Sequence, residues 1–248
     1  LPETRRLRWI PWLQAGGLLL TVLVGVAVVR TQRRADSERA WTSMARELAH
    51  QLGTPISSLQ GWLEVLRLSP AERPGDLGEH EIATAVGEDL ERLERISHRF
   101  ELIGRDPELG RLKLDVVVRE LERYLQARLP RFGPGVELTV DLPRGLPAVR
   151  GNAVLLAWAF ENIVKNALDA LAGRGGEIDI RAFEDDRDQV VLQIRDTGPG
   201  VEPEVRDRIF EPGVTTKSGG WGVGLALTRR IIEGVHRGRI ELLDERPW

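Results

Sequence analysis

The chain has no cysteine, which excludes disulfide bonds, thiolate zinc sites and cysteine nucleophiles. Histidine is scarce too: His50, His80, His98 and His236 are not paired at ligand spacing, so we expect no histidine-based metal site. The formal net charge of −3 leaves no basic excess, so we expect no nucleic-acid partner. With 42% hydrophobic and 29% charged residues, the composition is that of a folded globular chain.

Charged side chains are missing from one long early stretch, Trp9 to Val29. As a helix this stretch is long enough to cross the ~30 Å hydrocarbon layer of a membrane, and Trp9 and Trp12 lie where interfacial aromatics are found. A buried core helix or a signal peptide is the alternative, but the run is long for a signal and a charged helical segment follows it. Arginines flank both ends, so charge does not set the orientation. We expect a transmembrane helix at about 9–29 within a basic N-terminal segment, 1–34, and a further segment before Leu1.

Residues 35–108 have the pattern of two amphipathic helices. Apolar residues recur in steps of three and four from Trp41 to Leu66 and again from Ile82 to Ile103, and the stretch "SPAERPGDLG" separates the two runs. Two helices joined by a short breaker form an antiparallel hairpin. Because two helices bury too little apolar surface alone, we expect this hairpin to pair with a second copy as a four-helix bundle, making the protein a homodimer.

Residues 109–248 mix helices with strands and predict an α/β sandwich. The expected elements are a helix near 115–129, a strand in "VELTVDL", a helix over 153–171, strands over 177–183 and 189–195, a helix over about 223–233 and a last strand over 239–243.

Two polar segments of this domain are candidate ligand sites. In "ENIVKNALDA", Asn162 and Asn166 lie on one helix face with Lys165 beside them; an amide oxygen can ligate Mg²⁺, and lysine can meet phosphate. In "IRDTGPG", Asp196 ends a strand and could accept a hydrogen bond from an amino group, while the glycines allow close approach of a ligand. Surface asparagines and an ordinary β-turn explain these segments equally well when each is taken alone.

Two further segments are rich in glycine and threonine. The first, "RIFEPGVTTKSGG", contains Phe210, Thr215, Thr216 and Lys217. The second, "GGWGVGLALTRRII", contains Gly220, Gly222, Gly224 and Leu225. Its glycines precede a helix, whose first backbone amides can bind an anion. No strand leads directly into this segment, so it is not the dinucleotide-binding fingerprint.

Together and in this order, the four segments resemble the catalytic domain of histidine kinases, an ATP-binding sandwich shared with gyrase and mismatch-repair ATPases. Residues 161–170, 196–200, 210–217 and 220–225 are similar to its asparagine box, first glycine box, phenylalanine box and second glycine box. "HQLGTP" resembles the phosphoacceptor box on the dimerisation hairpin of the same family. The implied fold class is α+β: a transmembrane helix, a dimeric helical hairpin, and a gyrase- and histidine-kinase-type sandwich.

The resemblance implies ATP as substrate and Mg²⁺ as metal. Asn166 would hold Mg²⁺, Asn162 and Lys165 would support the phosphates, and Asp196 would bind the adenine amino group. Residues from about 199 to 222 would form a mobile lid, with Lys217 as a lid contact to phosphate. The amides of the second glycine box would reach the phosphates through Gly222 and Gly224, and the remaining ATP-binding positions would be Gly198, Gly200, Phe210, Thr215, Thr216, Gly220 and Leu225.

The same resemblance makes His50 the phosphoacceptor, which would pass its phosphoryl group to an aspartate in the receiver domain of a response regulator. The alternative is that His50 merely fills a bundle position. The box departs from the family at Gln51, where an acid is usual, and at Gly53, where a basic residue is usual. Glutamine accepts a hydrogen bond but is no base, so Glu47 is a candidate substitute. Thr54 resembles the residue that positions water for dephosphorylating a partner, which leaves a phosphatase role open.

We therefore interpret the sequence as a membrane-anchored sensor histidine kinase of a two-component system, in the inner or plasma membrane with its kinase portion cytoplasmic. One alternative is an ATPase of the same fold. The ATP-hydrolysing members of this fold carry a water-activating glutamate where this chain has Asn162, which cannot act as a base. Glu161 lies ~100° around the helix and so points elsewhere. The other alternative is a degenerate kinase that acts as a scaffold or phosphatase. Phosphorylation within or between protomers stays open, and we expect a further strand after Trp248, so that the catalytic domain is truncated in this chain.

Overall fold

The computed structural model describes residues 45–46, 48–69, 72–104, 107–126, 135–217 and 220–243, together with 18, 21, 24, 25, 31 and 42. The chain divides into two compact units, Leu1–Thr42 and Ser43–Trp248. Within the described residues, no helix combines the length and the apolar character needed to cross a membrane. The span expected at 9–29 lies almost wholly outside the described residues, as does Glu47, so both stay predictions. The domain boundaries 1–34, 35–108 and 109–248 stay predictions as well.

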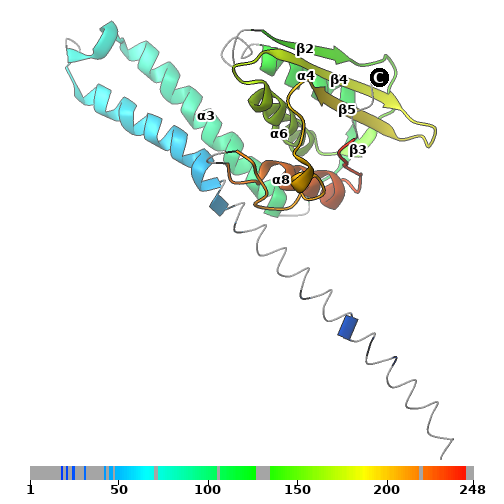
Figure 1. The fold of residues 1–248 in the computed structure, drawn as a ribbon. Coiled ribbons are helices and arrows are strands. Elements are labelled where there is room, and N and C mark those ends of the chain that lie inside the picture. Colours follow the sequence, from blue (N-terminus) through cyan, green and yellow to red (C-terminus); the bar gives the residue numbers. More distant parts are fainter. Residues whose placement is uncertain are drawn as a thin grey trace, which may run out of the picture. The chain divides into compact units, whose positions relative to one another are not determined.

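The second unit begins with a helix over residues 48–67, and the other elements follow it along the chain (Figure 1). They are η2 (Pro74–Asp76), α3 (Glu79–Gly104), β1 (Gly110–Leu112), α4 (Leu114–Gln126), β2 (Val136–Asp141), β3 (Val149–Gly151), α6 (Ala153–Leu171), β4 (Gly176–Glu184), β5 (Val190–Asp196), α7 (Pro203–Arg206), α8 (Gly224–Arg229) and η3 (Arg230–Val235).

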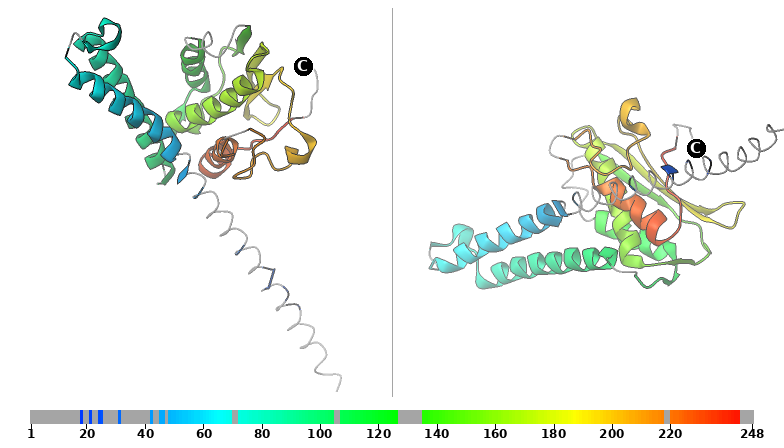
Figure 2. Two further views of the ribbon diagram at one scale, coloured as in Figure 1. Left: turned by 60° about the vertical axis from the view of Figure 1, so that its left-hand side comes forward. Right: turned by 90° about the horizontal axis from the view of Figure 1, so that it is seen from below.

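The helix over residues 48–67 and α3 lie side by side and run in opposite directions (Figures 1 and 2). The chain reverses through η2, where Gly75 has a φ of 66°, a left-handed conformation that favours glycine. Pro55 is fully buried and the helix continues through it. Ile82 and Ile96 of α3 are also buried. Apolar side chains of both helices are therefore covered within this unit.

The main sheet has the strand order β2-β4-β5. β2 pairs with β4 in parallel, with Leu138 opposite Ile178, and β4 pairs with β5 in antiparallel fashion, with Ile180 opposite Ile194. Along β4, Ile178, Ile180 and Ala182 are buried, so one side of this central strand faces the core. Helices α4 and α6 pack against the sheet, as Figure 1 shows. The core lies between these two helices and the sheet.

Helix α6 begins at Ala153 because Asn152 caps it, its Oδ1 accepting a hydrogen bond from Leu155 N at 3.1 Å. His236, which follows η3, connects that element to this cap. Its Nε2 accepts from Asn152 N at 3.0 Å, and its Nδ1 lies 2.8 Å from Ile231 O, so Nδ1 carries the proton and donates. This histidine is therefore a structural link between η3 and α6.

Most elements of the second domain fall where the sequence places them, and one does not. The bounds of α6 match the prediction, as do β2, β4 and β5 within a residue or two. The strand expected over 239–243 is absent from the described residues: this segment has no strand pairing there and is mostly exposed. Its alternating pattern fits a strand, but a segment becomes one only when its backbone pairs with a neighbouring strand.

Two adjacent valines of α4 test the position of the core. Val117 is 2% exposed, whereas Val116 is 49% exposed. We expect Val117→Ala to lower the free energy of unfolding by about 2 kcal/mol, because it removes buried methyl groups and leaves a cavity. The measurement is urea denaturation, with Val116→Ala as the matched control, for which we expect little change. Equal losses in the two variants would place the core elsewhere.

Candidate functional site

One face of α6 carries the polar side chains that the sequence singles out. Asn162 and Asn166 are both half-buried on this face, and Lys165 is exposed. Asn162 Nδ2 donates to Gly224 O at 3.4 Å, which places the start of α8 against the middle of α6. The asparagine segment and the second glycine segment, far apart in sequence, therefore meet in the fold.

Lys217 brings the lid segment to the same face of α6. Its ammonium group donates to Asn166 Oδ1 at 2.9 Å and forms an ion pair with Asp169 Oδ2 at 2.7 Å. The Lys217 and Asp169 side chains are 42% and 41% exposed, so water reaches the pair. Lys217, which the sequence assigns to phosphate, is thus in direct contact with Asn166, which the sequence assigns to Mg²⁺.

Asp196 is the last residue of β5, and its carboxylate shapes the turn that follows. Asp196 Oδ1 accepts from Gly198 N at 2.9 Å. A Cβ atom on Gly198 would lie 2.6 Å from that oxygen and 3.0 Å from Ala170 Cβ near the end of α6, so a side chain there would displace the Asp196 carboxylate. Asp196 therefore holds this turn through one of its two carboxylate oxygens.

Gly222 closes the loop that leads into α8. Its carbonyl accepts from Gly213 N at 3.0 Å, and its φ of 62° lies in the left-handed region. A Cβ atom here would lie 2.6 Å from Val214 O, against rigid backbone. Gly224, which begins α8, has more space around it. The atoms nearest to a Cβ atom there would lie 4.0 Å away, on Asn162.

The other residues assigned to the lid and glycine boxes lie around this loop. Thr215 Oγ1 accepts from Lys217 N at 3.1 Å, and Gly220 N donates to Lys217 O at 3.1 Å, so the lysine backbone is held on both sides. Thr216 is exposed. The remaining predicted positions are Gly200, which is exposed with a φ of 77°, and Phe210 and Leu225, which are half-buried.

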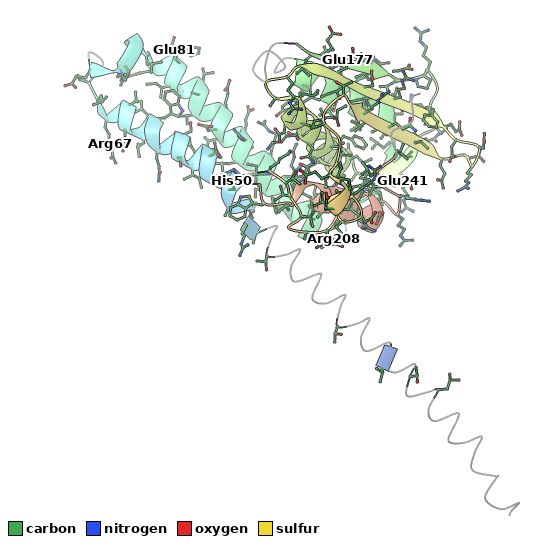
Figure 3. All side chains as sticks on the ribbon, in the orientation of Figure 1. His50, Arg67, Glu81, Glu177, Arg208 and Glu241 are labelled. Atoms are coloured by element: carbon green, nitrogen blue, oxygen red, sulfur yellow. The ribbon has the colours of Figure 1, made fainter. Side chains whose placement is uncertain are left out.

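His50 lies near the start of the helix over residues 48–67, at the end opposite to Arg67 (Figure 3). Its side chain is exposed, as is that of Thr54, one helical turn further on. Gln51 is half-buried. The imidazole is therefore accessible in this unit, as the phosphoacceptor interpretation requires.

A contact links the glycine loop to the helix of His50. The guanidinium carbon of Arg46 lies 5.9 Å from the centre of the Trp221 ring, within the range of a cation–π interaction. Arg46 precedes His50 by one helical turn, and Trp221 stands between Gly220 and Gly222. The candidate ATP site and the candidate acceptor helix therefore touch within one chain.

A second contact joins α3 to α6. Arg99 donates to Glu161 Oε2 at 2.7 Å, and its guanidinium lies over the ring of Trp158 at 5.5 Å. Phe100 packs on the same ring, with centroids 5.3 Å apart. The predicted orientation of Glu161, away from the face of Asn162, agrees with this ion pair.

The donor set fits Mg²⁺ bound together with phosphates. In the ranges that the structure describes, no three or more His, Cys, Asp or Glu side chains gather as a metal site. Mg²⁺ commonly takes a few protein oxygens and completes its shell with substrate phosphates and water. Asn166 Oδ1 already accepts a hydrogen bond from a cation, the Lys217 ammonium, so this oxygen is directed at a position where positive charge is favourable.

Comparisons with known proteins agree with this geometry. Residues 151–247 match the family described as histidine kinase-, DNA gyrase B-, and HSP90-like ATPase. The sensory histidine kinase/phosphatase NtrB of Escherichia coli O157:H7 is 30% identical over 237 residues, 89% of this chain and 65% of that protein. The sensor histidine kinase ZraS of Salmonella typhimurium is 30% identical over 214 residues, 85% of this chain and 44% of that protein. The structure of the catalytic domain of histidine kinase ThkA gives a TM-score of 0.50 at 27% identity, covering 56% of this chain and 89% of that one.

The resemblance to sensor histidine kinases is confirmed. Residues 151–247 have the α/β fold of the gyrase and histidine-kinase ATPases. The chain spans about half the length of the curated relatives it matches, 55% for NtrB of Rhizobium meliloti and 44% for ZraS.

The structure brings together the predicted residues of the asparagine box, the lid and the second glycine box, around Asn162, Asn166 and Lys217. Sequence reasoning missed Asp169, although it lies three residues after Asn166 and so on the same helix face. It also missed Arg99 and Trp221, whose contacts depend on tertiary placement and leave no local signal in the sequence.

The two glycines that flank Val223 provide a matched test of the second glycine box. We expect Gly222→Ala to destabilise the fold by about 1–3 kcal/mol, because the left-handed backbone and the contact with Val214 O both oppose a side chain. The thermal unfolding midpoint should fall by about 2–4 °C per kcal/mol. In Gly224→Ala, the atoms nearest to the added methyl group would lie 4.0 Å away, on Asn162. This substitution should therefore leave the midpoint nearly unchanged. Similar shifts for both variants would contradict the loop geometry.

Proposed function

We propose that this chain is an ATP-dependent histidine kinase that phosphorylates His50 and passes the phosphoryl group to an aspartate in the receiver domain of a response regulator. The observation that supports this most strongly is the arrangement within one compact unit. An exposed imidazole lies four residues after Arg46, whose guanidinium lies over the ring of Trp221 in the glycine loop. Lys217, just before this loop, contacts Asn166. An ATPase domain of this type next to an accessible nucleophile favours transfer to protein.

The residues of α6 and the lid would bind and orient ATP. Asp196 would accept a hydrogen bond from the adenine amino group, and Lys217 would place a positive charge at the phosphates. Asn166 would hold Mg²⁺ through its side-chain oxygen, and the metal would supply positive charge beside the phosphates. The backbone of Gly222 and Gly224 would approach the phosphates where no side chain intervenes.

His50 would act as the nucleophile. The lone pair of a neutral ring nitrogen forms the bond to the γ-phosphorus, the bond from that phosphorus to the bridging oxygen breaks, and ADP leaves. The remaining ring N–H can donate to the Gln51 side-chain carbonyl, which orients the ring but accepts no proton. The released proton therefore goes to water.

Hydrolysis of ATP is less well supported than transfer. Asn162, at the position of the water-activating glutamate in hydrolysing relatives, has no basic group and donates to Gly224 O. Glu161 forms an ion pair with Arg99 on an adjacent face of the helix. A phosphatase role toward the regulator is a second candidate, because Thr54 is exposed one turn from His50 and the relative NtrB is named a kinase/phosphatase.

The active protein would be a homodimer. Ile56, Leu63 and Leu66 on the first helix and Leu90 on α3 are 44%, 50%, 44% and 51% exposed. Such exposed apolar side chains on both helices would be covered if a second copy of the pair packed against them as a four-helix bundle. The uncharged stretch from Trp9 to Val29 would anchor the protein in the inner or plasma membrane, with the kinase portion in the cytoplasm, where ATP is available.

Labelling with γ-³²P-ATP and Mg²⁺ tests the central proposal. We expect label that is stable to base and labile to acid, as a phosphohistidine is, in the unchanged chain and in His80→Ala, a control that removes another exposed histidine. We expect none in His50→Ala or Asn166→Ala. Label retained in His50→Ala would exclude His50 as acceptor. If no variant is labelled, released phosphate would indicate a hydrolase, and ATP binding alone would indicate a scaffold or phosphatase.

Gln51→Glu tests the departure from the usual phosphoacceptor box. A carboxylate next to His50 can take the ring proton, which glutamine cannot, so we expect the initial rate of labelling to rise, by up to about 10²-fold. The rate is measured at saturating ATP so that binding does not contribute. An unchanged rate would show that the missing carboxylate does not limit transfer.

A further inference from the structure

Asp169 belongs to the polar face of α6 but has no role in the function proposed above. It follows Asn166 by three residues, so the two side chains project from the same face of the helix. Lys217 contacts both, at 2.9 Å from Asn166 Oδ1 and 2.7 Å from Asp169 Oδ2. One ammonium group of the lid is thus held by two oxygen atoms of α6.

The two contacts differ in what Mg²⁺ would do to them. Asn166 Oδ1 is the oxygen that we propose for Mg²⁺, and two cations at one amide oxygen repel each other strongly. Lys217 would therefore leave Asn166 when Mg²⁺ and nucleotide bind. Its ion pair with Asp169 does not share that oxygen and can persist. The lysine would then stay beside the phosphates instead of returning to solvent.

Holding the lysine has a free-energy consequence. A free lysine side chain loses conformational entropy when it is fixed. If Asp169 has already restricted the ammonium group, less of this loss remains when a phosphate is bound. The backbone of the same residue is held by Thr215 and Gly220 as well, so restriction of the side chain completes the ordering of this part of the lid.

We propose that Asp169 is a positioning residue that holds Lys217 at the phosphate side of α6 and thereby orders the lid for nucleotide binding. This inference rests on the proposed function in one respect, that the nucleotide phosphates bind at this face. The contact itself is a property of the chain alone and is measured separately.

Trypsin cleavage after Lys217 measures the contact without nucleotide. In Asp169→Asn the ammonium group loses its charged partner and becomes more available to the protease, so we expect faster cleavage there, by up to about fivefold, the range of an exposed ion pair. Cleavage after Arg187, in the exposed turn between β4 and β5, serves as the internal reference. Asp141→Asn, the same charge change at an exposed position at the end of β2, is the matched control and should behave like the unchanged chain. Equal cleavage in Asp169→Asn and the control overturns the proposal.

Nucleotide affinity measures the consequence. We expect Asp169→Asn to weaken binding of ATP with Mg²⁺ by up to about fivefold, and Asp169→Glu, which keeps the charge, to restore most of the loss. In a Lys217→Met background the same Asp169→Asn change should have no further effect, because the two residues act as a pair. Unchanged or tighter binding in Asp169→Asn, or an equal loss in the Lys217→Met background, overturns the proposal. Since neither measurement depends on labelling of His50, failure of the proposed phosphotransfer is a separate outcome.

Discussion

The packing of α8 against α6 determines the geometry of the candidate ATP site. Thr228 of α8 is fully buried, and its hydroxyl lies 2.9 Å from Gly224 O and 3.3 Å from Ala159 O. One turn along α6, Asn162 Nδ2 reaches the same Gly224 carbonyl. A buried hydroxyl is costly unless it is hydrogen-bonded, so these contacts fix the register of the two helices. Gly222 and the lid segment lie just before α8 in the chain, so the packing of α8 on α6 also positions them.

Helix α6 also carries the contact with the helix pair. Arg99 neutralises Glu161 and covers Trp158, which is buried, so an apolar and a charged contact act at the same place. Glu161 is the immediate neighbour of Asn162 in sequence, on an adjacent face of the helix. A displacement of α3 would therefore be transmitted to α6 next to the candidate ATP site. Because these contacts lie on different faces of α6, the helix can contact the hairpin and carry the candidate ATP-site residues at the same time.

The sequence predicts what depends on local pattern and misses what depends on pairing. α6 was predictable to the residue because a long apolar stripe starts at an asparagine cap. β1 and β3 were missed: each has three residues, and they pair across some forty positions, with Gly110 opposite Gly151. The strand expected over 239–243 was wrong for the converse reason, a suitable pattern without a partner strand in the described residues. Asn162, Asn166 and Lys217 were identified from their boxes, whereas Asp169 required the fold.

The chemistry available at the site depends on which groups its carboxylates contact. Two acids flank the asparagines of α6: Glu161 faces Arg99, and Asp169 faces Lys217. Each carboxylate is thus directed at a cation of another segment, one in α3 and one in the lid, and not at a water molecule beside the phosphates. A hydrolase needs a carboxylate positioned on such a water. A kinase takes its nucleophile from another group, and the exposed imidazole of His50 is the group that we propose for that role.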